Sequence, residues 1–328
     1  MSEILPVSRG LIGHLLGVLA GLASAGLCAF AGFHAESVLI LMAYFLAIPL
    51  YMAGFACGAL SGFLACLAGV AGVFAFAPAG FGIFYLFFDA IPAAILILLA
   101  MGRRVDADGA VTWRSEGTVL AVMTLYPCLI FMAVFVIAMG HDGGLQAMTL
   151  HALDGMSDQV TKLIAADGQK VTPEIIANIH QAFGMIARIM PAFVMCVWLF
   201  STFVDMAVAQ SFVGQRQWKL RPAFTLGNLH VPSLVVFAAA IVGLVAVFAP
   251  EPYRYVGLNL GLVLGVPFFF SGLAVIHGWA ARTAYPGAVL AGFYILLVAI
   301  VYLAFPVTFL GVLDQWVNFR KRFAEPKN

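Results

Sequence analysis

The sequence predicts an all-α protein whose helices form a polytopic transmembrane bundle of about eight or nine spans. Of the 328 residues, 63% are hydrophobic and only 9% are charged, whereas soluble domains carry about 25% charged residues. Several uninterrupted apolar runs exceed the ~18 residues that a helix needs to cross a bilayer. A transmembrane barrel would instead show short alternating segments, which this sequence lacks.

Nine apolar runs, separated by glycine, proline and charged residues, are the candidate spans. The first run is longer than the 7–15-residue core of a signal peptide, so we expect it to stay in the protein as a span. The second run is the shortest and continues into the third almost without a loop, which makes it the first candidate for a segment that does not fully cross. The runs are 11–33, 38–54, 57–77, 81–101, 118–140, 190–213, 231–249, 256–280 and 287–311.

One long region between the fifth and sixth runs does not have the composition of a span. Its apolar residues recur at helical period from Leu145 to Leu163. Further on, Thr172 followed by Pro173 is typical of an N-cap and the first residue of a helix. We therefore expect two amphipathic helices on the outer side, lying on the membrane or capping the bundle. Their predicted ranges are 147–166 and 173–189.

These features divide the chain into three predicted parts. The N-terminal part, 1–140, is a glycine-rich bundle of about five spans. The second, 141–189, is the amphipathic extracytoplasmic insertion, and the third, 190–328, is a bundle of about four spans with a basic tail. Net charge is +1, so the chain has no electrostatic footprint for nucleic acid.

The basic residues of the short loops predict the orientation of the bundle. If nine spans alternate, the loop cations fall on one side, which should be cytoplasmic. The same count places the basic tail on the outer side, so either one segment does not cross or the tail charges are tolerated there. The loop cations are Arg9, Arg103, Arg104, Arg114, Arg216, Lys219, Arg221 and Arg282, and the tail cations are Arg320, Lys321 and Arg322.

Two glycine stripes at i, i+4 spacing resemble glycine zippers. On a helix, each set of three glycines forms one smooth face that permits close approach of another backbone. Such a face either packs the protein's own helices or receives a partner helix or a substrate. The first stripe is Gly54, Gly58 and Gly62, and the second is Gly257, Gly261 and Gly265.

Asp89 and Asp205 are the acids that we place deep inside predicted spans. A carboxylate at mid-membrane costs about 2.5–3.5 kcal/mol on insertion scales, so something should offset that cost. Either the two acids bind a cation, a proton or a polar substrate group, or each lies near a helix end and is hydrated. His277 is a candidate partner, and Pro92 frees a backbone carbonyl that can share a cavity with the Asp89 carboxylate.

The sequence shows no catalytic or metal-binding signature. It contains no P-loop, HExxH, GxSxG or dinucleotide-binding turn. His151, Asp154 and Asp158 share one helix face, but without a recognised metal spacing an ordinary solvated face is expected. The five cysteines lie inside apolar runs and form no CxxC pair. We therefore expect no enzyme activity, no cofactor and no metal.

Several segments resemble the YybS-like family of uncharacterised bacterial membrane proteins. They are a Pro-Leu entry at 49–50, GFACGALSGFLACLAG, a Gly/Pro turn, an aromatic run ending in DAIPA, Arg103-Arg104, and GVLDQWVNFRKR at 311–322. The resemblance implies a multi-pass protein of the bacterial inner membrane. That family is in turn distantly similar to the S-components of energy-coupling-factor transporters and to the rod-shape protein MreD.

The S-component likeness implies a small-molecule site opening outward and a small-residue face that docks a transport subunit. Gly17, Gly21 and Ala25 are candidates for that face. We therefore expect a protein that binds or moves a small solute, with Asp89 and Asp205 in its cavity and 141–189 as the outer cover. The alternative, which the MreD likeness favours, is a non-transporting scaffold that docks envelope or morphogenesis partners. The expected partners are the lipid bilayer, a small-molecule ligand and other membrane subunits.

Overall fold

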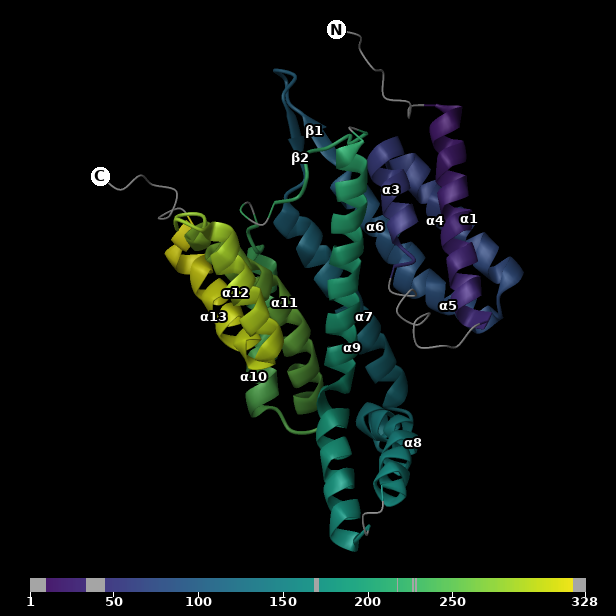
Figure 1. Cartoon of the computed structure of the whole chain (residues 1–328), viewed down its shortest axis with the longest axis vertical. Helices are drawn as coiled ribbons and strands as arrows, with labels where there is room; N and C mark the ends of the chain where they lie inside the picture. The colour runs from purple at the N-terminus through teal and green to yellow at the C-terminus, as the bar shows by residue number, and fades with distance from the viewer. Residues whose placement is uncertain are drawn as a thin grey trace. The chain divides into compact units, whose positions relative to one another are not determined.

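The structure is a computed structural model, which describes residues 10–33, 45–167, 171–216, 218–225, 227 and 229–320. The predicted all-α class is confirmed, with one short hairpin as the exception (Figure 1). Contacts divide the chain into two compact units, which are described in turn. The first is Met1–Met123 with Trp198–His230, and the second is Thr124–Val197 with Val231–Asn328.

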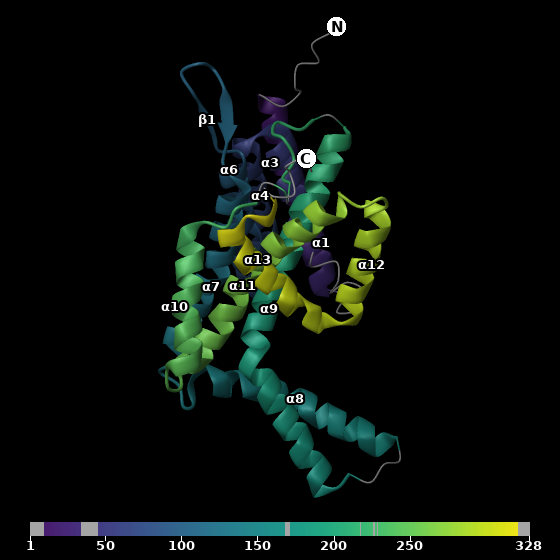
Figure 2. The same ribbon diagram turned by 90° about the vertical axis from the view of Figure 1, so that its left-hand side faces the viewer.

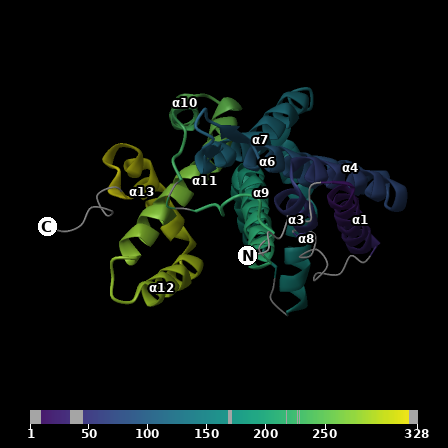
Figure 3. The same ribbon diagram turned by 90° about the horizontal axis from the view of Figure 1, so that it is seen from above.

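Among its described residues, the first unit contains five helices, one π-helical turn and parts of two longer helices. Helix α1 packs against α3 and α4, an arrangement visible in Figures 1 and 3. Helix α7 (Glu116–Ala138) begins in this unit, and α9 (Pro173–Gln215) ends in it. The remaining elements are α1 (Leu11–Phe33), α3 (Ile48–Cys57), α4 (Ala59–Phe76), α5 (Ala79–Tyr85), the π-turn η1 (Leu86–Ala90) and α6 (Ile91–Ala100).

The small-residue face of α1 is occupied inside the protein. A Cβ atom at Gly17 or Gly21 would overlap the backbone oxygen of Ser61 or Ala65 on α4. Such backbone contact requires glycine, because neither helix backbone can yield to an added methyl group. The face that the resemblance assigned to docking a transport subunit is therefore covered by α4.

The first glycine stripe does not lie on one helix, which corrects the prediction. Gly58 has a φ of +98°, a conformation that side chains disfavour, and it separates α3 from α4. Across this break, a Cβ at Gly62 would lie 2.8 Å from the Cα of Gly54. Both positions also contact Ile97 of α6. The stripe thus packs three helices of the same chain together.

A two-stranded hairpin, which sequence analysis missed, connects α6 to α7. Strand β1 (Arg103–Val105) pairs antiparallel with β2 (Val111–Trp113), and Arg103 lies opposite Trp113. Its signal was Asp108-Gly109 between short β-type segments, since Asp-Gly is a preferred hairpin turn. Gly109 has the positive φ, +79°, that such a turn requires.

The second unit places α11 between two neighbouring helices. Helix α11 packs against both α10 and α13 (Figure 3). Gly257 approaches the backbone of Ala246 on α10, while Gly272 and Gly311 bring α11 and α13 into backbone contact. At Gly261 and Gly265, the two other members of the second stripe, an added Cβ would make ordinary contacts of 3.7 Å with Val242 and Thr308. The new elements are α8 (Gly144–Ala166), α10 (Ser233–Phe248), α11 (Tyr253–Ala280), α12 (Pro286–Ala299), the 3-10 turn η3 (Val301–Leu303) and α13 (Ala304–Val317).

The amphipathic region contains the first of its two predicted helices. Helix α8 matches the predicted range 147–166 closely. The second prediction was wrong as a separate element, because α9 runs for 43 residues from Pro173 through Pro191 to Gln215. Figure 2 shows α8 and the beginning of α9 as two separate helices.

The number of candidate spans is six, or seven if one bent pair counts as a span, among the described residues. The prediction of eight or nine was too high because three apolar runs form shorter or broken helices. Helix α3 has 10 residues and α10 has 16; at 1.5 Å per residue, neither reaches the ~30 Å of a bilayer core. Helices α12 and α13 are bent by 115° at residue 300 (Figure 2). The start of the predicted 38–54 run, Arg9, Lys321 and Arg322 lie outside the described residues.

Candidate functional site

The first unit brings together the two acids that sequence analysis selected. Asp89 lies in the π-turn η1, and Asp205 lies on α9. The two carboxylates interact electrostatically with each other. Both also act on the phenol of Tyr51 on α3, a side chain that is only 1% exposed. Three elements that are far apart in the sequence therefore contribute to one polar region.

The carboxylate of Asp205 lacks a compensating partner on one side. Asp205 is 3% exposed, and its Oδ1 is buried without a hydrogen bond to any residue that the structure describes. Neither Asp89 nor Asp205 forms an ion pair with a cationic side chain in the described part of the chain. A buried carboxylate without partners is unfavourable, and a second carboxylate nearby increases that cost. The arrangement suits a positively charged or proton-donating ligand.

A backbone carbonyl next to Asp89 is bonded to another helix. Pro92 has no N–H to donate, and the π-turn before it is bonded i→i+5, with Ile91 N donating to Leu86 O. The indole Nε1 of Trp198 on α9 donates to Phe88 O at 2.8 Å. This bond ties α9 to the residue preceding Asp89, so Trp198 helps to position the acid. π-Turns such as η1 are frequent at functional sites.

Trp198→Phe is expected to lower the free energy of unfolding by about 1–3 kcal/mol, because it removes the indole N–H that donates to the Phe88 carbonyl. Phenylalanine retains an aromatic ring near Phe88, which now meets Trp198 edge-on at 6.4 Å between centroids. Denaturant unfolding in detergent measures the change. Trp316→Phe is the control, since Trp316 is 67% exposed. Equal stability of the two variants would contradict this role for Trp198.

Hydroxyl groups from neighbouring helices extend the polar region. Ser24 Oγ on α1 lies 2.7 Å from Tyr85 OH and donates to Leu46 O at 2.6 Å. Gly69 leaves room for the Tyr85 hydroxyl, which an added Cβ would overlap. Asp89 also interacts electrostatically with Tyr85. The sequence did not predict that this region would include Ser24, Tyr51 and Tyr85. The indication available for each was a polar group inside an otherwise apolar run.

His277 belongs to the second unit, on α11. Its Nε2 lies 2.8 Å from the hydroxyl of Tyr294 on α12, and the two rings meet edge-on. The predicted candidate therefore has a hydrogen-bonding partner in its own unit.

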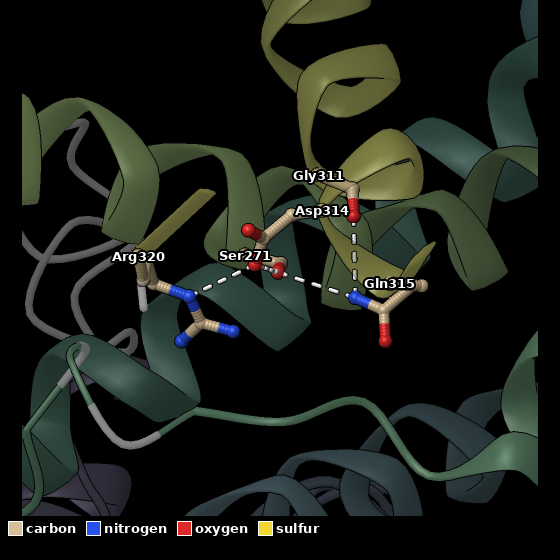
Figure 4. A network of polar contacts seen from close by, with 5 residues as sticks. All are labelled: Ser271, Gly311, Asp314, Gln315 and Arg320. Atoms are coloured by element: carbon tan, nitrogen blue, oxygen red, sulfur yellow. Dashed lines mark hydrogen bonds and ion pairs between the residues drawn. The ribbon is translucent and has the colours of Figure 1, made fainter. Parts of the chain in front are cut away.

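A third interior acid, Asp314, was missed because it was read as the beginning of the basic tail. Helix α13 extends to Val317 and packs Asp314 against α11, where it is 2% exposed. Figure 4 shows the network: Arg320 Nε donates to Asp314 Oδ2 at 2.8 Å, and Ser271 Oγ donates to the same oxygen at 3.5 Å. Gln315 Nε2 donates to Ser271 Oγ and to Gly311 O. Unlike Asp205, Asp314 is paired with a cation.

The amphipathic helix α8 carries an exposed pair of side chains. His151 Nδ1 and Asp154 Oδ2 are 3.1 Å apart on the surface of α8. Within the described ranges, no three His, Cys, Asp or Glu side chains come together.

Comparison with known proteins gives one match. The family described as "Predicted membrane protein (DUF2232)" matches residues 37–315, the greater part of the chain. No curated protein and no solved structure matches the chain.

Proposed function

The chain belongs to the DUF2232 family of predicted membrane proteins, and from this premise we propose that it binds and moves a small cationic solute or ion through Asp89 and Asp205. It is a multi-pass membrane protein in contact with the lipid bilayer. The observation that carries the proposal is the electrostatic interaction of two interior carboxylates, one of which has a buried oxygen without a hydrogen-bond partner in the described part of the chain.

The ligand chemistry follows from the groups present. Two nearby carboxylates favour a positive charge between them, and charged side chains at membrane depth commonly mark ion or substrate paths. Tyr51 and Tyr85 add hydroxyl groups that can orient a bound ion or amine. The distant likeness to S-components supports a small solute as the ligand.

The scaffold alternative has less support from the packing. It relied on glycine faces that receive partner proteins, but Gly54 and Gly62 contact Ile97 of the same chain. Gly257 likewise packs against α10. These faces are used within the protein.

The test compares Asp89→Asn, Asp205→Asn and the double variant with the wild type. In cation-free buffer, each single variant should be more stable than the wild type by about 0.5–2 kcal/mol, because one of two repelling charges is gone, as often occurs at functional sites. Added ligand should raise the melting temperature of the wild type alone, since a ligand that binds the folded state stabilises it. Na⁺, K⁺ and small organic amines are the probes.

Asp108→Asn in the hairpin turn is the matched control, and it should keep the wild-type response to every probe. Destabilisation by both single substitutions would assign the acids a purely structural role. An unchanged response of the double variant to a cation that stabilises the wild type would place the binding site elsewhere.

A further inference from the structure

A cavity of about 370 Å³ lies at the end of α9 in the first unit, and it shares no lining residue with the acid pair. Gln210 from α9, Lys219 and Arg221 from the following loop, and Phe55 from α3 contribute to its wall. Its volume lies within the range of small-molecule sites. The cavity has no part in the function proposed above.

The amide of Gln210, one of the lining residues, has a fixed orientation. Gln210 Oε1 accepts the backbone N–H of Phe224 at 3.2 Å, which determines the orientation of the amide group. Its Nε2 is buried and has no acceptor among the described residues. Buried polar atoms in proteins are almost always paired, so this donor calls for an acceptor from outside the chain.

The described lining of the cavity contains two charged residues, Lys219 and Arg221, and both are cations. Arg221 is held in place because its Nη1 donates to Ala100 O at 2.7 Å and its guanidinium lies 3.8 Å from the centre of the Phe224 ring. Burial lowers the pKa of this guanidinium, with Glu116 acting in the opposite direction, so a bound anion would favour its charged form.

The loop that carries these cations is anchored at several points. Leu220 N donates to Phe55 O at 3.3 Å, which joins the loop to the end of α3. Arg221 also lies 5.7 Å from the ring of Trp113 in the hairpin, so two of the predicted basic loops meet here. The cavity is therefore formed before any ligand binds.

We propose that this cavity binds a phosphoryl anion, which accepts from Gln210 Nε2 and is neutralised by Lys219 and Arg221. A phosphate offers several acceptor oxygens and the charge that two cations match. The cavity lies at the end of a candidate span, Pro173–Gln215, and includes the apolar side chains of Phe55 and Leu220. Basic pockets between membrane helices bind anionic lipid headgroups, and a soluble phosphate compound is the second source of the same chemistry.

The test is native mass spectrometry of the full-length protein titrated with phosphatidylglycerol, with phosphatidylcholine as the zwitterionic lipid. Gln210→Glu keeps the acceptor for Phe224 N and replaces the donor with an anionic oxygen. We expect it to weaken the tightest phosphatidylglycerol site at least tenfold, and Lys219→Gln to weaken it about tenfold. Arg216→Gln, a matched loss of charge in the same loop but outside the lining, should leave that site unchanged.

A thermal-shift titration with inorganic phosphate identifies the source. Stabilisation by phosphatidylglycerol alone indicates a lipid, and stabilisation by phosphate at the same residues indicates a soluble phosphate compound. If Gln210→Glu does not fold, the affinities of Lys219→Gln and Arg216→Gln for phosphatidylglycerol still test the proposal, because both positions are exposed. Three results would overturn the proposal. They are an equal loss of affinity in Lys219→Gln and Arg216→Gln, wild-type affinity of a folded Gln210→Glu, and no binding of either probe to the wild-type protein.

Discussion

Asn259→Leu is expected to lower the free energy of unfolding by about 2–5 kcal/mol, because it removes the partner of two backbone groups of α9. Asn259 lies on α11 and is fully buried. Its Oδ1 accepts the N–H of Ala192 at 2.8 Å, and its Nδ2 donates to Arg188 O at 2.9 Å. These two backbone groups are an i, i+4 pair of one helix, between which the amide of Asn259 is inserted.

Pro191 explains why α9 needs this amide. A proline inside a helix removes one N–H, and its ring pushes against the carbonyl four residues earlier. That carbonyl, Ala187 O, accepts from the hydroxyl of Tyr255, one turn before Asn259 on α11. Tyr255 and Asn259 together satisfy the backbone groups around the proline, which lets α9 continue as one helix of 43 residues.

Denaturant titration of the purified protein in detergent measures this effect, with Asn178→Leu as the matched control on an exposed part of α9. Asn259→Asp keeps the acceptor for Ala192 N but replaces the donor to Arg188 O with a buried carboxylate oxygen. Because a buried carboxylate without a partner is unfavourable, we expect it to be at least as destabilising as Asn259→Leu. A loss no greater than that of Asn178→Leu would refute the role of Asn259.

The same inserted amide shows what the sequence could and could not predict. Composition alone predicts membrane helices, because a bilayer demands long apolar segments whatever their neighbours are. Whether a proline ends a helix depends on a side chain from another element. Run length therefore placed a boundary near 189, but Asn259 and Tyr255 carry α9 through it.

The candidate site was likewise predictable from the sequence only in part. Asp89 and Asp205 could be selected from the sequence, because an acid inside an apolar run is costly wherever the run packs. Their association, and the contribution of Tyr51, depend on how α3, η1 and α9 pack, which no local pattern specifies. At Gly58 a local pattern gave a wrong prediction. Its spacing with Gly54 and Gly62 indicated one helix, but its positive φ ends α3 there.

Arg320→Met is expected to destabilise the second unit by about 3–5 kcal/mol, because it leaves a buried charge on Asp314 without its partner. The pair is well enclosed, with 1% of the Asp314 side chain and 14% of the Arg320 side chain exposed. Of the described hydrogen-bond partners of the carboxylate, Ser271 then remains, and its contact of 3.5 Å is long for a hydrogen bond to a charge. Arg254→Met, at an exposed position of α11, is the matched control.

A double-mutant cycle separates the cost of an isolated charge from the value of the pair. Replacing both residues, as Asp314→Leu with Arg320→Met, removes the buried charge altogether and should cost less than Arg320→Met alone. Because the pair is shielded from solvent, the effect of Arg320→Met should persist at high salt, where exposed pairs are screened. A double variant at least as unstable as Arg320→Met would contradict this explanation. It would mean that Asp314 stabilises α13 through packing and the Ser271–Gln315 contacts, and that an unpaired Asp314 charge is not the cause of the instability.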